Sequence, residues 1–112
     1  MSPSLPIVRG TVSFLALAAL ARGGRMHGFQ GLRWIQQSSD GDLLIEEGAL
    51  YPTLHRMEKQ GWIEADWAVS EKGRRAKYYS LTKAGERALS QETTAWSKYV
   101  DAVAKVTGEG TS

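Results

Sequence analysis

Cysteine is absent from this 112-residue sequence, and histidine and proline are scarce, with two and three residues. Without cysteine the chain can form neither a disulfide nor a thiolate metal site, which suits a reducing compartment such as the cytoplasm. The two histidines, His27 and His55, fall on different predicted helices, and neither lies in a metal-ligand spacing. The sequence contains no glycine-rich phosphate loop and no nucleophile elbow. These absences argue against an enzyme, and we expect no metal and no cofactor.

Long hydrophobic runs are also missing. The most apolar segment, Val12 to Ala21, is much shorter than the roughly 20 residues that a membrane-spanning helix needs. It also lacks the cationic start and the cleavage site of a signal peptide. A hydrophobic fraction of 42% with four tryptophans is instead typical of a small globular protein. We therefore expect a cytoplasmic protein that does not bind a membrane.

The net charge of +2 is small, but the positive charge is concentrated in one place. Four cations, Lys72, Arg74, Arg75 and Lys77, fall within six residues, and the rest of the chain sums to minus two. A basic cluster on a neutral-to-acidic body is typical of a surface that binds nucleic acid. Charge alone also allows a solvated loop, so the position of the cluster in the fold has to decide.

A stretch in the middle of the chain predicts an amphipathic helix. Between Glu46 and Gln60, apolar residues recur at the spacing of one helix face, and Gly61 can end the helix because it tolerates a positive φ. The residues predicted to face the core are Leu50, Leu54 and Met57. The residues left on the exposed face are Glu47, Ala49, Pro52, Thr53, Arg56 and Lys59, with Tyr51 at its border.

A β-hairpin is predicted directly after this helix. Apolar and polar residues alternate from Ile63 to Ser70, which predicts a half-buried strand, and a second strand is predicted from Ala76 to Leu81. The basic cluster lies in the turn between them. A helix followed by a hairpin with a cationic tip is how a winged helix-turn-helix binds DNA, with the helix in the major groove and the tip at phosphates or the minor groove. We therefore predict a mainly α fold with a small β-hairpin, of the α+β class.

Aromatic residues of the hairpin are predicted mainly to pack. Of the adjacent Tyr78 and Tyr79, one is expected to point inward and the other to lie near the surface, because strand residues alternate between faces. Trp62 and Trp67 are interpreted as core or hairpin packing.

Two helices are predicted before the amphipathic helix, after a tail at Met1 to Pro6. The first, Arg9 to Arg22, is apolar nearly all round its centre, so it has to be covered on most sides. A second copy of the chain is the expected cover, with Phe14 and Leu17 in contact with it. The second helix starts at His27-Gly28, runs to about Ser38 and is expected to brace the reading helix.

A long helix is predicted at the end of the chain, from Lys83 to about Thr107, with Thr82 as its N-cap. It would be about 37 Å long, at about 1.5 Å per residue. That is longer than a small domain can cover, so we expect the helix to protrude and pair; packing on its own domain is the alternative. Its seam, the stripe of residues that would contact the second helix, follows alternating steps of four and three residues. It is predicted at Leu89, Thr93, Trp96, Val100 and Val103. Residues 1–81 would then form a DNA-binding domain, and residues 82–112 a dimerisation helix and tail.

Several segments, in this order and spacing, resemble the PadR family of bacterial transcriptional regulators, over about Leu5 to Val106. The matching segments are His27-Gly28-Phe29, Glu47-Gly48-Ala49-Leu50-Tyr51-Pro52-Thr53-Leu54, Arg56-Met57-Glu58, Gly61-Trp62-Ile63, Gly73-Arg74-Arg75-Ala76-Lys77-Tyr78-Tyr79, Leu81-Thr82 and Gly85. The resemblance is to the short type with a single C-terminal dimerisation helix. It departs from the family at Ala49, where serine or threonine is common, which implies one polar DNA contact fewer.

The resemblance also gives Trp96 two possible roles. Some short members bind flat aromatic drugs between paired tryptophans at the corresponding position of the last helix. Trp96 is therefore interpreted either as a buried anchor of the dimer interface or as a platform for a small aromatic effector.

The sequence thus predicts a homodimeric regulator of transcription, a repressor on a palindromic operator of double-stranded DNA, with reading helices about 34 Å apart. Thr53 and Arg56 are expected near base edges, and Ala49 and Pro52 against the groove wall or thymine methyl groups. The predicted phosphate and wing contacts are Tyr51, Lys59, Lys72, Arg74, Arg75 and Lys77. Two alternatives stay open: a winged-helix module that binds protein instead of DNA, and a drug sensor with its pocket at the dimer interface.

Overall fold

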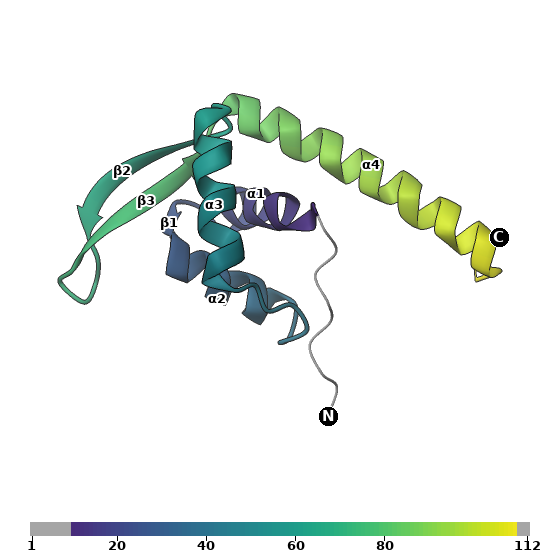
Figure 1. Ribbon diagram of the computed structural model, residues 1–112, viewed down its shortest axis with the longest axis horizontal. Helices are drawn as coiled ribbons and strands as arrows, with labels where there is room; N and C mark the ends of the chain where they lie inside the picture. Colours follow the sequence, from purple (N-terminus) through teal and green to yellow (C-terminus); the bar gives the residue numbers. More distant parts are fainter. Residues whose placement is uncertain (1–9, 110–112) are drawn as a thin grey trace.

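The computed structural model describes residues 10–109, so the predicted tail at Met1 to Pro6 and the predicted helix start at Arg9 lie outside it. Within the described residues the chain forms four helices and one three-stranded antiparallel sheet, which confirms the predicted α+β winged-helix fold (Figure 1). In chain order the elements are α1 (Thr11–Gly23), β1 (Met26–His27), α2 (Gly28–Ser38), α3 (Glu47–Lys59), β2 (Ile63–Val69), β3 (Arg75–Leu81) and α4 (Lys83–Thr107).

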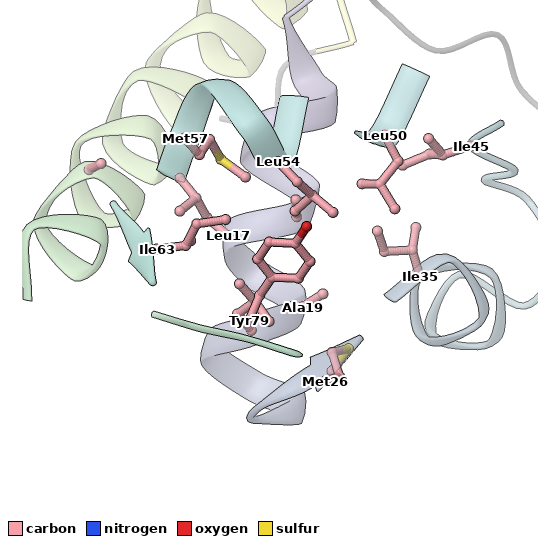
Figure 2. Close-up of a cluster of buried hydrophobic side chains, with 13 residues drawn as sticks. Leu17, Ala19, Met26, Ile35, Ile45, Leu50, Leu54, Met57, Ile63 and Tyr79 are labelled. Carbon is pink, nitrogen blue, oxygen red and sulfur yellow. The ribbon is translucent and has the colours of Figure 1, made fainter. Parts of the chain in front are cut away.

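Helix α1 is the centre of the hydrophobic core. It packs against α2, α3, β3 and the beginning of α4, because it is apolar on nearly every face. Figure 2 shows Leu17 of α1 beside Met57 and Ile63, with the ring of Tyr79 close to the same helix. The cover that was predicted to come from a second copy is therefore supplied to a large extent by the chain itself.

The sheet has the order β1-β3-β2, and its hairpin strands pair from Ile63 opposite Leu81 to Val69 opposite Arg75. Only the half of the hairpin near α4 lies over the body, and the other half projects away from it (Figure 1). The predicted half-buried strand is therefore found only in the first part of β2. Ile63 is buried, whereas Trp67 and Val69 are 56% and 70% exposed; of the two roles expected for Trp67, core or hairpin packing, core packing is therefore excluded.

Strand β1 was not predicted, because two residues carry no periodicity. Met26 and His27 pair with Tyr79 and Tyr78, and they place β3 in the middle of the sheet. This corrects the expectation for the two tyrosines, since both are buried. Tyr79 points into the core, and the Tyr78 ring is covered by the Arg25 guanidinium at 4.3 Å and by the His27 ring at 5.4 Å.

Helix α2 begins with a capping box and lies in close contact with α3. The amide of Gln30 donates to Nδ1 of His27, and the amide of His27 donates to Oε1 of Gln30, so α2 starts where predicted. A Cβ on Gly28 would meet the Tyr51 ring of α3 at 2.6 Å, so glycine allows the close approach of these helices. Helix α2 is thereby fixed beside the first turns of α3.

Helix α4 begins and ends at the predicted residues. The Thr82 hydroxyl caps it by accepting from the Gly85 amide at 3.1 Å, and donates to the Gly61 carbonyl at 2.6 Å. Beyond Leu89, residues 90–103 are all exposed, and Figure 1 shows the helix running away from the body. The prediction that α4 protrudes is therefore confirmed, while its pairing with a second copy, like the division at residue 81, stays a prediction. Across residues 10–109, none of the helices combines the length and hydropathy of a membrane span.

Candidate nucleic-acid interface

Helix α3 buries one face and exposes the other, as predicted. Leu50, Leu54 and Met57 are buried, and the exposed face carries Ala49, Pro52, Arg56 and Lys59, together with Glu47, Gly48 and His55. Pro52 lies in the second turn of the helix, where it provides no N–H for the carbonyl four residues earlier. The exposed face is therefore small and mixed in polarity near the start of the helix and basic towards its end.

Thr53 departs from its predicted role. Its side chain is only 5% exposed, and its hydroxyl donates to the carbonyl of Ala49 at 3.0 Å, so the expectation that it faces base edges is wrong. The helical turn places Thr53 next to the core stripe of Leu50 and Leu54 rather than opposite it. Its oxygen instead accepts from the Arg56 guanidinium at 3.5 Å, which makes Thr53 a support for Arg56.

The tip of the hairpin is a tight, hydrogen-bonded turn. The Ser70 amide donates to the Arg74 carbonyl at 2.7 Å, and the Gly73 amide donates to the Ser70 carbonyl at 2.8 Å. Gly73 has a φ of +76°, which favours glycine there. The turn holds the backbone in place and leaves Lys72, Arg74 and Arg75 exposed.

The inner face of the hairpin and the beginning of α2 enclose a groove of about 560 Å³, which we call the wing groove. Tyr51 of α3 also lines it. Five cations and a single carboxylate line it, so it favours anions. The cations are Arg33, Lys72, Arg74, Arg75 and Lys77, and the carboxylate is Glu71; the other residues used below are Phe29, Gln30 and Trp67.

Two predicted contact residues in the groove have altered titration behaviour. The Lys77 ammonium donates to Glu58 at 3.0 Å, and this hydrogen bond raises the pKa of Lys77. Burial, and then the charge of Glu47, raises the pKa of the Tyr51 phenol. Tyr51 is therefore a neutral hydrogen-bond donor at physiological pH, and Lys77 is charged but already paired.

Besides Gly28, three groove residues on α2 were not predicted as site residues: Phe29, Gln30 and Arg33. The guanidinium of Arg33 lies 6.0 Å from the centre of the exposed Phe29 ring, and Gln30 donates to Glu71 across the groove at 3.4 Å. Exposed arginines are common on helices, so nothing in the local sequence marks Arg33. Only the folding of the hairpin back towards α2 brings it to the basic cluster.

The residues predicted for dimerisation divide into two groups. Leu17 is fully buried among residues of its own chain, so its assignment as a contact between copies is wrong, and Leu89 packs partly against the same core. Thr93, Trp96, Val100 and Val103 are exposed along α4. Phe14 is partly buried and lies 6.2 Å from Trp96, measured between ring centres.

Within the described part of the chain, no three histidine, aspartate or glutamate side chains come together as metal ligands. The fold and the groove together are those of a winged helix-turn-helix: a braced reading helix with an exposed face beside a basic wing. The sequence model of the transcriptional regulator PadR-like family matches residues 16–91, more than half of the chain, and the protein belongs to this family. Members of the family are transcriptional regulators and not enzymes.

Known relatives agree with this assignment. The transcriptional regulator Rv3488 of Mycobacterium tuberculosis is 36% identical over 63 residues, covering 55% of this chain and 58% of its own. The structure of a transcriptional regulator from Clostridium thermocellum, Cth-833, is 28% identical with a TM-score of 0.78, over 87% of this chain and 93% of that one. The fold is shared with Bacillus subtilis PadR, solved in complex with operator DNA (TM-score 0.65, 19% identity, 74% of this chain and 46% of that one).

Proposed function

We propose that the protein binds double-stranded DNA through α3 and the wing groove. The observation that carries this proposal is the set of five cations in the groove, which α3 lines with Tyr51, a residue at the border of its exposed face. A strand of phosphates that leaves the major groove beside α3 would pass along these cations. Arg33, which the groove brings to the basic cluster, is part of this proposed surface.

The exposed side chains of α3 divide into proposed base and backbone contacts. Arg56, held by Thr53, is proposed to meet base edges, where its planar guanidinium suits guanine. Ala49 and Pro52 offer small apolar surface to the groove wall or to thymine methyl groups. Tyr51 and Lys59 are proposed phosphate contacts, together with the cations of the wing.

We further propose that the protein acts as a homodimer through α4. Trp96, Val100 and Val103 are 41%, 45% and 40% exposed on a helix that leaves the body, and a second α4 would cover them. A two-fold dimer requires a palindromic operator with half-sites about one helical turn, roughly 34 Å, apart. Bound at a promoter in the cytoplasm, such a dimer would exclude RNA polymerase, so we propose that the protein is a repressor. Expression of a reporter gene from that promoter is then expected to rise when the gene for this protein is deleted.

A mobility-shift titration with the promoter region of its own operon, repeated at several salt concentrations, tests DNA binding. The double variant Arg74→Ala/Arg75→Ala is expected to weaken binding to all sequences and to lower the slope of log K against log salt by about two. Arg87→Ala/Lys98→Ala removes two exposed cations from α4 and serves as the charge-matched control, with the slope unchanged. Equal slopes for the wild type and the wing variant would contradict the role of the wing. No binding to any duplex would favour the protein-interaction module.

Base reading is tested separately. Arg56→Ala is expected to change which sequences are selected from a random pool of duplexes, by about 1–3 kcal/mol at one position. Lys59→Ala is the control, because it removes one positive charge from the same helix. It is expected to weaken binding without changing the selected sequence. A selection profile of Arg56→Ala identical to that of the wild type would remove Arg56 from the proposed base contacts.

A second function, binding of a small aromatic effector, is favoured by the surroundings of Trp96. Its ring lies 6.2 Å from that of Phe14 and 6.1 Å from that of Tyr99, and the side chain is partly exposed. We propose that a flat aromatic compound stacks there and releases the operator. Quenching of tryptophan fluorescence by planar cationic dyes is expected for the wild type and is expected to be lost in Trp96→Phe. Equal quenching in both proteins would show that the dye does not bind at Trp96, and the role of this residue would then be packing.

A further inference from the structure

Trp67 is an exposed aromatic residue at a place where the core cannot explain it. It lies on the projecting half of the hairpin, in β2, with its side chain in the wall of the wing groove. Its neighbour on the same strand face, Val69, is still more exposed, so the body of the protein does not cover this part of the sheet. Packing in the hydrophobic core therefore does not account for a tryptophan at this position.

The contact that Trp67 does make is with a cation of the groove. The Arg75 guanidinium lies 4.7 Å from the centre of the Trp67 ring. The strand register accounts for this contact, because Arg75 is paired with Val69, and Trp67 is the next residue along on the same face of the sheet. The indole therefore offers Arg75 a flat surface on which the guanidinium can stack.

Arg74 provides an internal contrast. Its backbone takes part in the turn, but within residues 10–109 its side chain has no ion pair and no ring contact. Of the two adjacent arginines at the tip, only Arg75 is thus held in one direction before any partner arrives. A side chain that is already ordered loses less conformational entropy when it binds.

We propose that Trp67 is a positioning residue for DNA binding, whose indole holds the Arg75 guanidinium at the wall of the wing groove, where it meets a phosphate. The proposal rests on the DNA-binding function proposed above and assigns Trp67 a part in it that acts through Arg75. Trp67 itself carries no charge, so its effect on affinity is expected to be independent of counterion release.

A double-mutant cycle of Trp67→Leu and Arg75→Ala tests the proposal. Leucine keeps an apolar side chain on the strand and removes the ring. We expect Trp67→Leu to weaken binding to a fluorescent duplex about two- to five-fold, the range of an exposed cation–π contact, without changing the salt slope. In the Arg75→Ala background the same substitution is expected to have no effect, because the group that it positions is gone. Trp67→Phe, which keeps an aromatic face, is expected to retain most of the affinity.

Two control variants use neighbouring positions. Val69→Ala removes an exposed apolar side chain from the same strand face and is expected to leave the affinity unchanged. Arg74→Ala combined with Trp67→Leu is expected to give additive losses, since Arg74 does not stack on Trp67. If Trp67→Leu costs as much in the Arg75→Ala background as in the wild type, the indole contacts DNA directly and the positioning role is overturned. No loss in the wild-type background would overturn it as well.

A measurement without DNA separates this proposal from the DNA-binding function. The indole ring current is expected to shift the NMR resonances of the Arg75 side chain upfield, and Trp67→Leu is expected to abolish that shift while leaving the Arg74 resonances in place. If the wild type binds no duplex, the proposed function fails, and the Arg75 resonances alone then decide whether Trp67 orders this side chain. Unshifted Arg75 resonances in the wild type would contradict the proposal even if DNA is bound.

Discussion

Helices α1 and α4 both contain apolar surface that was expected to be covered by a second copy of the chain, but only the surface of α1 is largely covered by the chain itself. Helix α1 lies among α2, α3, β3 and the start of α4, and its apolar residues are buried there. Helix α4 is the last element of the described chain, and beyond Leu89 its Trp96, Val100 and Val103 stay exposed, even though the Phe14 ring of α1 lies 6.2 Å from that of Trp96. An apolar pattern shows that a helix needs cover, whereas its place in the chain determines whether that cover is available from the same molecule.

The comparison predicts that a core deletion in α1 has the largest effect. Leu17→Ala is expected to lower the free energy of unfolding by about 2–5 kcal/mol at any protein concentration, because it leaves a cavity in the chain's own core. Val100→Ala in α4 is the matched change, and its smaller effect is expected to depend on protein concentration, since the cover comes from a second chain. Urea unfolding at two protein concentrations measures both. A concentration-dependent effect of Leu17→Ala would contradict the division between the helices.

The next largest loss of stability is expected from a substitution at Gly85, in the first turn of α4, which we call the root of α4. A Cβ at Gly85 would collide with the backbone carbonyl of Trp62, which cannot move aside as a flexible side chain can. Gly85→Ala is therefore expected to cost about 1–3 kcal/mol, as overpacking does. Gly48→Ala is the control, because a Cβ there meets nothing within 4 Å and alanine favours the helix by up to about 1 kcal/mol. Thermal unfolding that ranks these variants in the opposite order would refute this account of the root.

A smaller loss is expected from the cap of α4. Thr82→Val removes the hydroxyl that accepts from the Gly85 amide and donates to the Gly61 carbonyl, at a cost of about 1 kcal/mol. Thr82→Ser keeps both hydrogen bonds and is expected to unfold within a few tenths of a kcal/mol of the wild type. Equal losses in valine and serine variants, measured by chemical denaturation, would show that the methyl group rather than the hydroxyl matters.

The smallest effect is expected at the surface ion pair of Arg25 and Asp66, whose side chains lie 3.3 Å apart from Nε to Oδ1. The hydrogen bond from Arg25 lowers the pKa of Asp66 from its ordinary value of 3.8. A lowered pKa stabilises the fold above pH 3.8, and that contribution is lost as the pH falls through the folded-state pKa. Asp66→Asn is thus expected to lower Tm slightly at pH 7 and not at the acid end. Glu64→Gln, on the same strand, is the control; a Tm difference for Asp66→Asn that persists in acid would exclude the ion pair as its cause.

Periodic elements could be predicted from the sequence to within a residue or two. Helix α4 needs only Thr82 as a cap and a run without glycine or proline beyond its first turn, and α3 needs only its core stripe and Gly61. These signals are local. Strand β1 could not be predicted in the same way, because Met26 and His27 become a strand only by pairing with β3.

The charged residues of the candidate site could be predicted from the sequence, whereas the directions in which individual side chains point were harder to predict. The basic cluster of the wing is evident in the sequence. The burial of Thr53, however, depends on a small rotation of the helix. The position of Arg33 beside the basic cluster depends on the hairpin folding back towards α2. The alternation in β2 also gave no warning that Trp67 lies beyond the edge of the body. In each case a tertiary contact, absent from the local pattern, determined the outcome.

The central claim is that a second copy covers the exposed seam of α4 and so places two reading surfaces on one operator. Sedimentation equilibrium of the full chain, alone and with a promoter duplex, tests it most directly, beside a Val100→Glu/Val103→Glu variant checked for folding by circular dichroism. We expect the wild type to sediment as a dimer with two chains on each duplex, and the folded variant to sediment as a monomer with much weaker binding. A wild-type protein that stays monomeric at high concentration and binds its duplex as a single chain would contradict the account.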